Sequence, residues 1–76
     1  MEKRIIEILA EIRPDIDFQQ EAKLFEEGLL DSFDLVSIIS ELNDEFNIAI
    51  RVTELKPENF NSASAMAELV KRLQKT

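Results

Sequence analysis

The sequence contains neither cysteine nor histidine. The lack of cysteine excludes disulfide bonds and thiolate metal sites. Together the two absences remove most zinc sites and the Cys–His and Ser–His nucleophilic pairs. No apolar run approaches the roughly 18 residues that a membrane span needs, and the residues after Met1 lack the long apolar region of a signal peptide. We therefore expect a soluble cytoplasmic protein that is not an enzyme.

Residues that interrupt regular structure are also scarce, because the chain has one glycine and two prolines. Its 76 residues, 45% hydrophobic and 33% charged, fit one small globular domain over residues 1–76.

Negative charge is concentrated in the middle of the chain. The sequence has 16 acidic and 9 basic residues, a net charge of −7. Residues 24–50 contain no Lys or Arg but hold seven carboxylates: Glu26, Glu27, Asp31, Asp34, Glu41, Asp44 and Glu45. Such a segment repels nucleic acids and anionic membranes and favours basic protein partners. It is either a solvated helix face or a docking surface.

Apolar spacing predicts an all-α fold. A first helix is expected over Lys3–Arg13, ending before Pro14 because proline disfavours helix at the preceding residue. A long loop follows over Asp15–Leu30, with a possible helical turn at Ala22–Glu26, and a loop of this length often carries function. The next helix is expected over Ser32–Phe46, capped by Asp31 or Ser32.

The remaining residues predict a linker, a short helix and a last long helix. The linker covers Asn47–Val52, and Thr53 is expected to cap a short helical stretch that ends at Phe60. The last helix should begin near Ser62 and end near Leu73. The expected architecture is a small bundle of three principal helices plus one short helix.

The helix over residues 32–46 has a core stripe and an unusual opposite face. With about 100° per residue, Leu35, Ile38, Ile39, Leu42 and Phe46 share one side. Phe33 lies almost opposite this stripe and Val36 lies on its flank, beside Ser37, Ser40 and Asp44. Phe33 could fold under the preceding loop, or it could be an apolar anchor in an acidic docking surface.

Ser32 stands at the start of this helix, after a loop that contains Gly28. A phosphate attached there would meet the positive end of the helix dipole. A serine at this position can equally be a simple helix cap.

Residues 28–36, Gly-Leu-Leu-Asp-Ser-Phe-Asp-Leu-Val, resemble the attachment motif of acyl and peptidyl carrier proteins. The resemblance extends over most of the chain: Leu55–Phe60 is similar to the family's short third helix, and Asn61–Ala63 to the opening of its last helix. It implies an acyl carrier protein-like bundle in which Ser32 carries 4′-phosphopantetheine, transferred from coenzyme A by a phosphopantetheinyl transferase. The arm would hold an acyl or aminoacyl group as a thioester, which gives a chain without cysteine a role in thiol chemistry.

The resemblance also implies a docking face for partner enzymes. The transferase would recognise Asp31, and Phe33 and Val36 would make apolar contacts with partner enzymes. The other members of the expected face are Asp34, Ser37, Ser40, Glu41 and Asp44. Such interfaces are small and sensitive to salt, and we expect the carrier itself to be a monomer.

Details of the motif favour one branch of the family. Fatty-acid carriers usually have Glu and Met where this chain has Ser37 and Ser40, which points away from fatty-acid synthase partners. The Gly-Leu-Leu-Asp-Ser order is more similar to D-alanyl carrier proteins and other stand-alone carriers. We therefore expect loading by an adenylate-forming ligase, with D-alanine or another small acid as cargo, and delivery to a downstream acyltransferase or synthase.

Alternatives of other kinds remain at this stage. The chain could be a fatty-acid or polyketide carrier, or an unmodified helical adaptor that binds through Phe33 and Val36. A calcium loop beginning at Asp15 is disfavoured because its sixth position is Gln20, where the EF-hand needs glycine. A hydrolase using Asp31 and Ser32 is rejected, since no histidine can relay the proton.

Overall fold

The computed structural model describes residues 1–75, and these form helices joined by loops without any strand. Helix α1 spans Glu2–Ile12, α2 spans Ser32–Phe46 and α4 spans Ala63–Gln74. Between α2 and α4 lie a 3-10 turn, η1 (Val52–Glu54), and a short helix, α3 (Pro57–Phe60). The expected all-α bundle of three principal helices and one short helix is confirmed.

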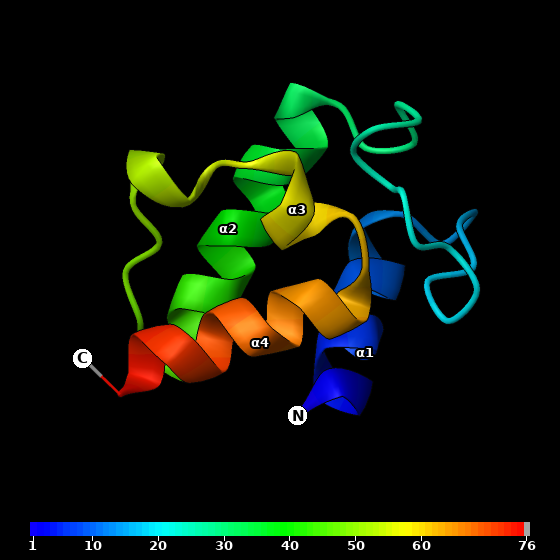
Figure 1. Cartoon of the computed structure of the whole chain (residues 1–76). Helices are drawn as coiled ribbons and strands as arrows, with labels where there is room; N and C mark the ends of the chain where they lie inside the picture. Colours follow the sequence, from blue (N-terminus) through cyan, green and yellow to red (C-terminus); the bar gives the residue numbers. More distant parts are fainter. Residues whose placement is uncertain (76) are drawn as a thin grey trace.

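Helices α1, α2 and α4 pack against one another, and α3 lies against α4 (Figure 1). The long connection between α1 and α2 runs along one side of the bundle. Side chains from every helix and from this connection form one apolar core, and none of the described polar or charged residues is buried. None of the helices in residues 1–75 is long and apolar enough to cross a membrane.

Local sequence explains where α1 and α4 begin and end. Helix α1 buries Ile5, Ile8 and Leu9 at helical spacing and ends at Ile12, just before the Arg13–Pro14 pair. The hydroxyl of Ser62 accepts a hydrogen bond from the backbone N–H of Ala65 at 3.0 Å and so caps the start of α4. Small buried residues at 63 and 67 let α4 approach its neighbours closely.

The predicted role of Thr53 is wrong. Thr53 lies inside η1, and neither η1 nor α3 has a side-chain cap at its start. Helix α3 begins instead with Pro57, whose fixed φ suits the first position of a helix. The side-chain amide of Asn59 donates to the carbonyl of Glu54 at 2.8 Å, which holds the two short elements together.

The long connection contains turns but no helix. In an early turn the N–H of Gln20 donates to the carbonyl of Asp17 at 3.1 Å, and a later turn runs from Lys23 to Gly28, where the N–H of Glu27 donates to the carbonyl of Lys23 at 2.9 Å. The later turn lies slightly beyond the expected turn at 22–26 and stops at Gly28, whose φ of 75° is left-handed. Apolar character predicts that Phe18, Leu24 and Phe25 anchor the connection; Phe18 and Leu24 are buried, and Phe25 is partly buried against the core.

Candidate functional site

Ser32 is the first residue of α2, and its side chain is exposed. The residue before it, Asp31, is the N-cap: its carboxylate accepts a hydrogen bond from the N–H of Asp34 at 2.8 Å. The carboxylate of Asp34 in turn accepts from the N–H of Asp31 at 3.4 Å, which completes a capping box. Asp31 therefore caps the helix, and Ser32 does not.

This arrangement leaves the Ser32 hydroxyl available. It makes no hydrogen bond within residues 1–75. The backbone N–H groups of Ser32 and Phe33 also lack partners in that part of the chain, as the first-turn donors of a helix do unless a cap or ligand accepts them. An exposed hydroxyl beside two free N–H donors at the positive end of a 15-residue helix suits a covalently attached phosphate.

The loop before Ser32 is fixed by buried leucines. Leu24 and Leu30 are both in the core, and the N–H groups of Leu29 and Leu30 donate to the carbonyl of Leu24 at 2.9 and 3.2 Å. The left-handed Gly28 allows the chain to reverse between them. Burial of Leu30 thus holds the chain two residues before Ser32.

Asn61, at the end of α3, accepts hydrogen bonds from the backbone of the same loop. Its carbonyl accepts from the N–H of Leu24 at 2.8 Å. Its side-chain oxygen accepts from the N–H groups of Phe25 and Glu26 at 3.1 and 3.0 Å. Three backbone donors that would otherwise lack a partner are satisfied by one residue.

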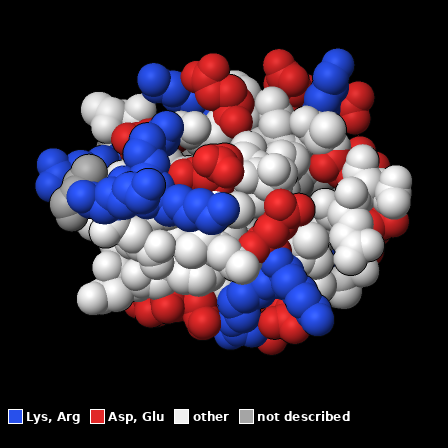
Figure 2. Space-filling model, turned by 60° about the horizontal axis from the view of Figure 1, so that its bottom comes forward, with Lys and Arg blue, Asp and Glu red and all other residues white. Residues whose placement is uncertain are grey.

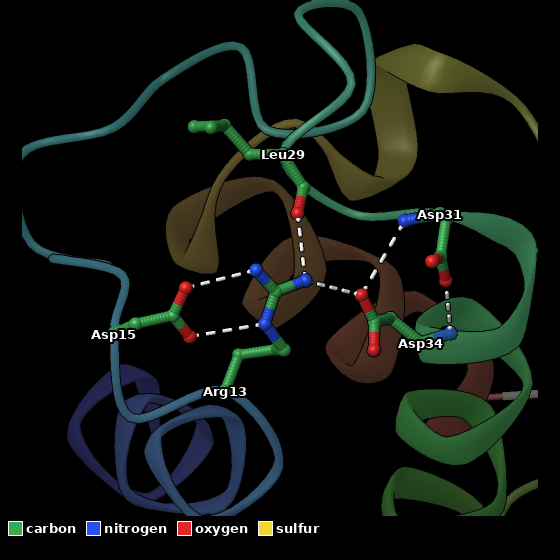
Figure 3. A network of polar contacts seen from close by, with 5 residues as sticks. All are labelled: Arg13, Asp15, Leu29, Asp31 and Asp34. Atoms are coloured by element: carbon green, nitrogen blue, oxygen red, sulfur yellow. Dashed lines mark hydrogen bonds and ion pairs between the residues drawn. The ribbon is translucent and has the colours of Figure 1, made fainter.

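Arg13 joins the end of α1 to this region (Figure 3). Its guanidinium donates to Asp15, to the carbonyl of Leu29 and to the carboxylate of Asp34. The hydrogen bonds from Arg13 lower the pKa of Asp15, and those with Asp15 and Asp34 raise the pKa of Arg13. Neither Arg13 nor Asn61 was among the predicted site residues. The absence of any cation in residues 24–50 gave no signal for Arg13, because most carboxylates of that segment have no cation partner in residues 1–75.

The expected docking residues divide into two groups. Phe33 is 82% exposed and Val36 is 68% exposed, and the side chains of Asp31, Ser40, Glu41 and Asp44 are also exposed. Ser37 is half-buried. Asp34 differs, since its side chain is only 13% exposed and is paired with Arg13. Its charge is thus already engaged within the molecule.

Two further apolar side chains are exposed on η1 and the residue after it. Val52 is 81% exposed and Leu55 is 42% exposed. Their exposure could not be predicted, because this segment has no regular period that separates a core face from a solvent face. On the face in Figure 2, basic side chains stand in separate groups, each with acidic side chains beside it. No group of three or more acidic side chains in residues 1–75 could hold a metal ion.

Comparison with known proteins identifies the family. The family model described as "Phosphopantetheine attachment site" matches residues 3–70. The chain belongs to this family. Its members carry 4′-phosphopantetheine, and the chain is a phosphopantetheine-dependent carrier protein.

Several relatives of this chain are D-alanyl carrier proteins. The D-alanyl carrier protein of Lactobacillus delbrueckii subsp. bulgaricus is 32% identical over 97% of this chain and 94% of the relative. The D-alanyl carrier protein of Streptococcus sanguinis is 34% identical over 92% of this chain and 90% of the relative. That of Lactococcus lactis subsp. cremoris is 33% identical over 92% of this chain and 91% of the relative. These matches confirm the resemblance seen in residues 28–36. They favour neither the fatty-acid carrier nor the unmodified adaptor.

Proposed function

We propose that Ser32 carries the 4′-phosphopantetheine arm and that the carrier, a single domain over residues 1–76, presents D-alanine or another small acid to partner enzymes. One observation supports this choice of residue above the other exposed serines. The unbonded hydroxyl of Ser32 stands at the first position of α2, beside the free N–H groups of Ser32 and Phe33, because Asp31 serves as the cap.

Attachment requires one phosphoryl-type displacement. The Ser32 oxygen attacks the phosphorus of coenzyme A that bears the pantetheine, a phosphoester bond forms, and adenosine 3′,5′-bisphosphate leaves. The chain has no histidine to accept the hydroxyl proton, so the proton passes to a base on the phosphopantetheinyl transferase. The carrier then supplies the nucleophile and its placement, and we assign it no catalytic activity of its own.

The first turn of α2 favours the product of this step. The attached phosphate brings negative charge to a helix start where the N–H groups of Ser32 and Phe33 are free. Bonds from N–H donors to a phosphate are charge-assisted and stronger than bonds between neutral groups. The N–H groups of Asp31 and Asp34, by contrast, already donate hydrogen bonds to each other's carboxylates.

The exposed face of α2 is the proposed docking surface. Phe33 and Val36 supply apolar contacts, and Asp31, Ser37, Ser40, Glu41 and Asp44 surround them. A surface of this kind attracts basic partners electrostatically and releases them quickly. Asp34 supports this surface through its pair with Arg13.

The cargo and the partners follow from the relatives. Since those reported above are named D-alanyl carrier proteins, D-alanine is the first cargo to test, loaded by an adenylate-forming ligase and passed to a downstream acyltransferase or synthase. Loading and priming consume ATP and coenzyme A, so we place the carrier in the cytoplasm. It acts as a monomer, since a carrier must offer the same face to successive enzymes.

The test is intact mass after incubation with coenzyme A and a broad-specificity transferase. The wild type should gain one phosphopantetheine group and Ser32→Ala none. Ser64→Ala is the control, because Ser64 is an exposed serine on α4, outside the proposed docking surface, and it should gain one group. An adduct on Ser32→Ala would move the site to another residue. Incubation of the modified carrier with ATP, D-alanine and a D-alanyl ligase then tests the cargo.

A further inference from the structure

The guanidinium of Arg13 binds one set of partners through Nε and Nη2 and another through Nη1. Through Nε and Nη2 it donates to the carboxylate of Asp15 at 3.0 and 2.9 Å. Nη1 alone donates to the carbonyl of Leu29 at 3.0 Å and to Oδ2 of Asp34 at 2.5 Å. Figure 3 shows the guanidinium between the loop and the first turn of α2, with Asp15 on the other side.

The contacts of Nη1 lie on both sides of Ser32. Leu29 precedes Ser32 by three residues and Asp34 follows it by two. Oδ2 of Asp34 accepts two hydrogen bonds, one from Nη1 of Arg13 and one from the N–H of Asp31. One nitrogen of Arg13 is therefore linked to the loop directly and to the capping box through Asp34.

This part of the network is the less exposed part. The side chain of Asp34 is 13% exposed, whereas that of Asp15 is 62% exposed. A charge-assisted bond in a less solvated place is stronger than one at the surface. The contacts of Nη1 should therefore order the chain more than the pair with Asp15 does.

We propose that Arg13 is a positioning residue, which holds the Ser32 hydroxyl in the conformation that the phosphopantetheinyl transferase modifies. Nη1 fixes the loop at Leu29 and the helix start at Asp34, so that the segment between them has one conformation. Loss of Nη1 leaves Asp34 without its cation and the Leu29 carbonyl without its donor, and the segment samples other conformations. The inference rests on the proposed attachment at Ser32.

Arg4 provides a matched control. It joins the same two helices by a bidentate pair, with its Nε and Nη2 each 3.0 Å from a carboxylate oxygen of Glu45. Glu45 lies in the last turn of α2, at the opposite end of the helix from Ser32. Arg4→Gln removes an ion pair between α1 and α2 without touching the Ser32 region.

The experiment compares transferase kinetics for four variants at a temperature where all are folded. Arg13→Gln should lower kcat/KM by on the order of tenfold, the effect expected when the binding-competent conformation is populated in about one molecule in ten. The loss should appear in KM, because only a fraction of the carrier is competent to bind. Arg13→Lys should restore the rate, because one ammonium can donate to both Leu29 and Asp34. Asp15→Asn and Arg4→Gln should behave as the wild type.

Amide hydrogen exchange on the free carrier supplies a second readout. The N–H groups of Asp31 and Asp34 should exchange faster in Arg13→Gln but not in Arg4→Gln. Unchanged exchange together with a raised KM would overturn the proposal, because Arg13 would then contact the transferase directly. Equal losses in Arg13→Gln and Arg4→Gln would also overturn it, since the effect would be general stability. Failure of the wild type to accept phosphopantetheine is a separate result, which would refute the proposed function itself.

Discussion

Arg4 in the first turn of α1 and Glu45 in the last turn of α2 form a bidentate ion pair, with both nitrogen–oxygen distances at 3.0 Å. The hydrogen bonds from Arg4 lower the pKa of Glu45 from its ordinary value of 4.5. A carboxyl group whose pKa is lower in the folded state stabilises the fold above its unfolded pKa. That contribution disappears as the pH falls through the folded pKa.

Glu45→Gln should therefore lower the melting temperature at neutral pH and have little effect in acid. The pair is exposed, so the difference at neutral pH should be small. It should shrink as the pH falls below about 4.5 and disappear once the pH has fallen through the lowered pKa of Glu45, where the carboxyl group is neutral. Thermal unfolding followed by circular dichroism at both pH values measures the difference. A constant difference across this range would show that the charge of Glu45 is not involved.

Leu42 and Phe33 lie on the same helix with opposite exposure. The side chain of Leu42 is 0% exposed and that of Phe33 is 82% exposed. Leu42→Ala should therefore destabilise the fold by about 2–5 kcal/mol through a lost contact area and a cavity. Phe33→Ala should change stability by less than about 1 kcal/mol, as surface substitutions do. Urea unfolding of the two variants tests this, and equal losses would contradict the packing of α2.

Phe33→Ala should instead weaken the partner reactions. The substitution removes the largest exposed apolar side chain of the proposed docking face, so KM for the loading ligase should rise by about tenfold, equivalent to a contact of about 1.4 kcal/mol. The KM for the wild type should also rise with salt. Leu55→Ala is the control for apolar exposure outside α2. Unchanged ligase kinetics with Phe33→Ala would remove Phe33 from the docking surface.

The behaviour of α2 could be predicted because its determinants are local. The apolar stripe of residues 35–46 fixed which side faces the core, and so which side leaves Phe33 and Val36 exposed. Asp31 and Ser32 were the two expected caps, and Asp31 is the one used. The bounds Ser32–Phe46 were predicted correctly from the apolar stripe and these cap candidates.

The parts that could not be predicted depend on residues far apart in the sequence. Arg13 meets Asp34 across 21 residues and Asn61 meets Phe25 across 36, and no local pattern encodes such pairs. The cap proposed at Thr53 failed because Pro57 sets the start of α3 more strongly than a possible side-chain cap does.

Asn61→Ala should loosen the loop before Ser32. The N–H groups of Phe25 and Glu26 would lose their shared acceptor, and an unsatisfied polar group costs about 1–3 kcal/mol when buried and less when water reaches it. We therefore expect faster amide exchange at these two residues and a modest fall in stability. Asn61→Asp is the control, since it keeps the acceptor oxygen. Its amides at 25 and 26 should stay protected, although its charge lies near Glu26.

The clustered carboxylates give the last prediction. Of the seven in residues 24–50, only Asp34 and Glu45 pair with a cation in the described chain, so Glu41 and Asp44 repel each other and their neighbours. Raising the salt concentration from about 0.01 M to 0.1 M shortens the Debye length from about 30 Å to about 10 Å. The melting temperature should therefore rise over this range, and the double variant Glu41→Gln, Asp44→Asn should start higher and respond less. A wild-type melting temperature that falls steadily with salt would mean that the ion pairs of Arg4 and Arg13 outweigh the repulsion within α2.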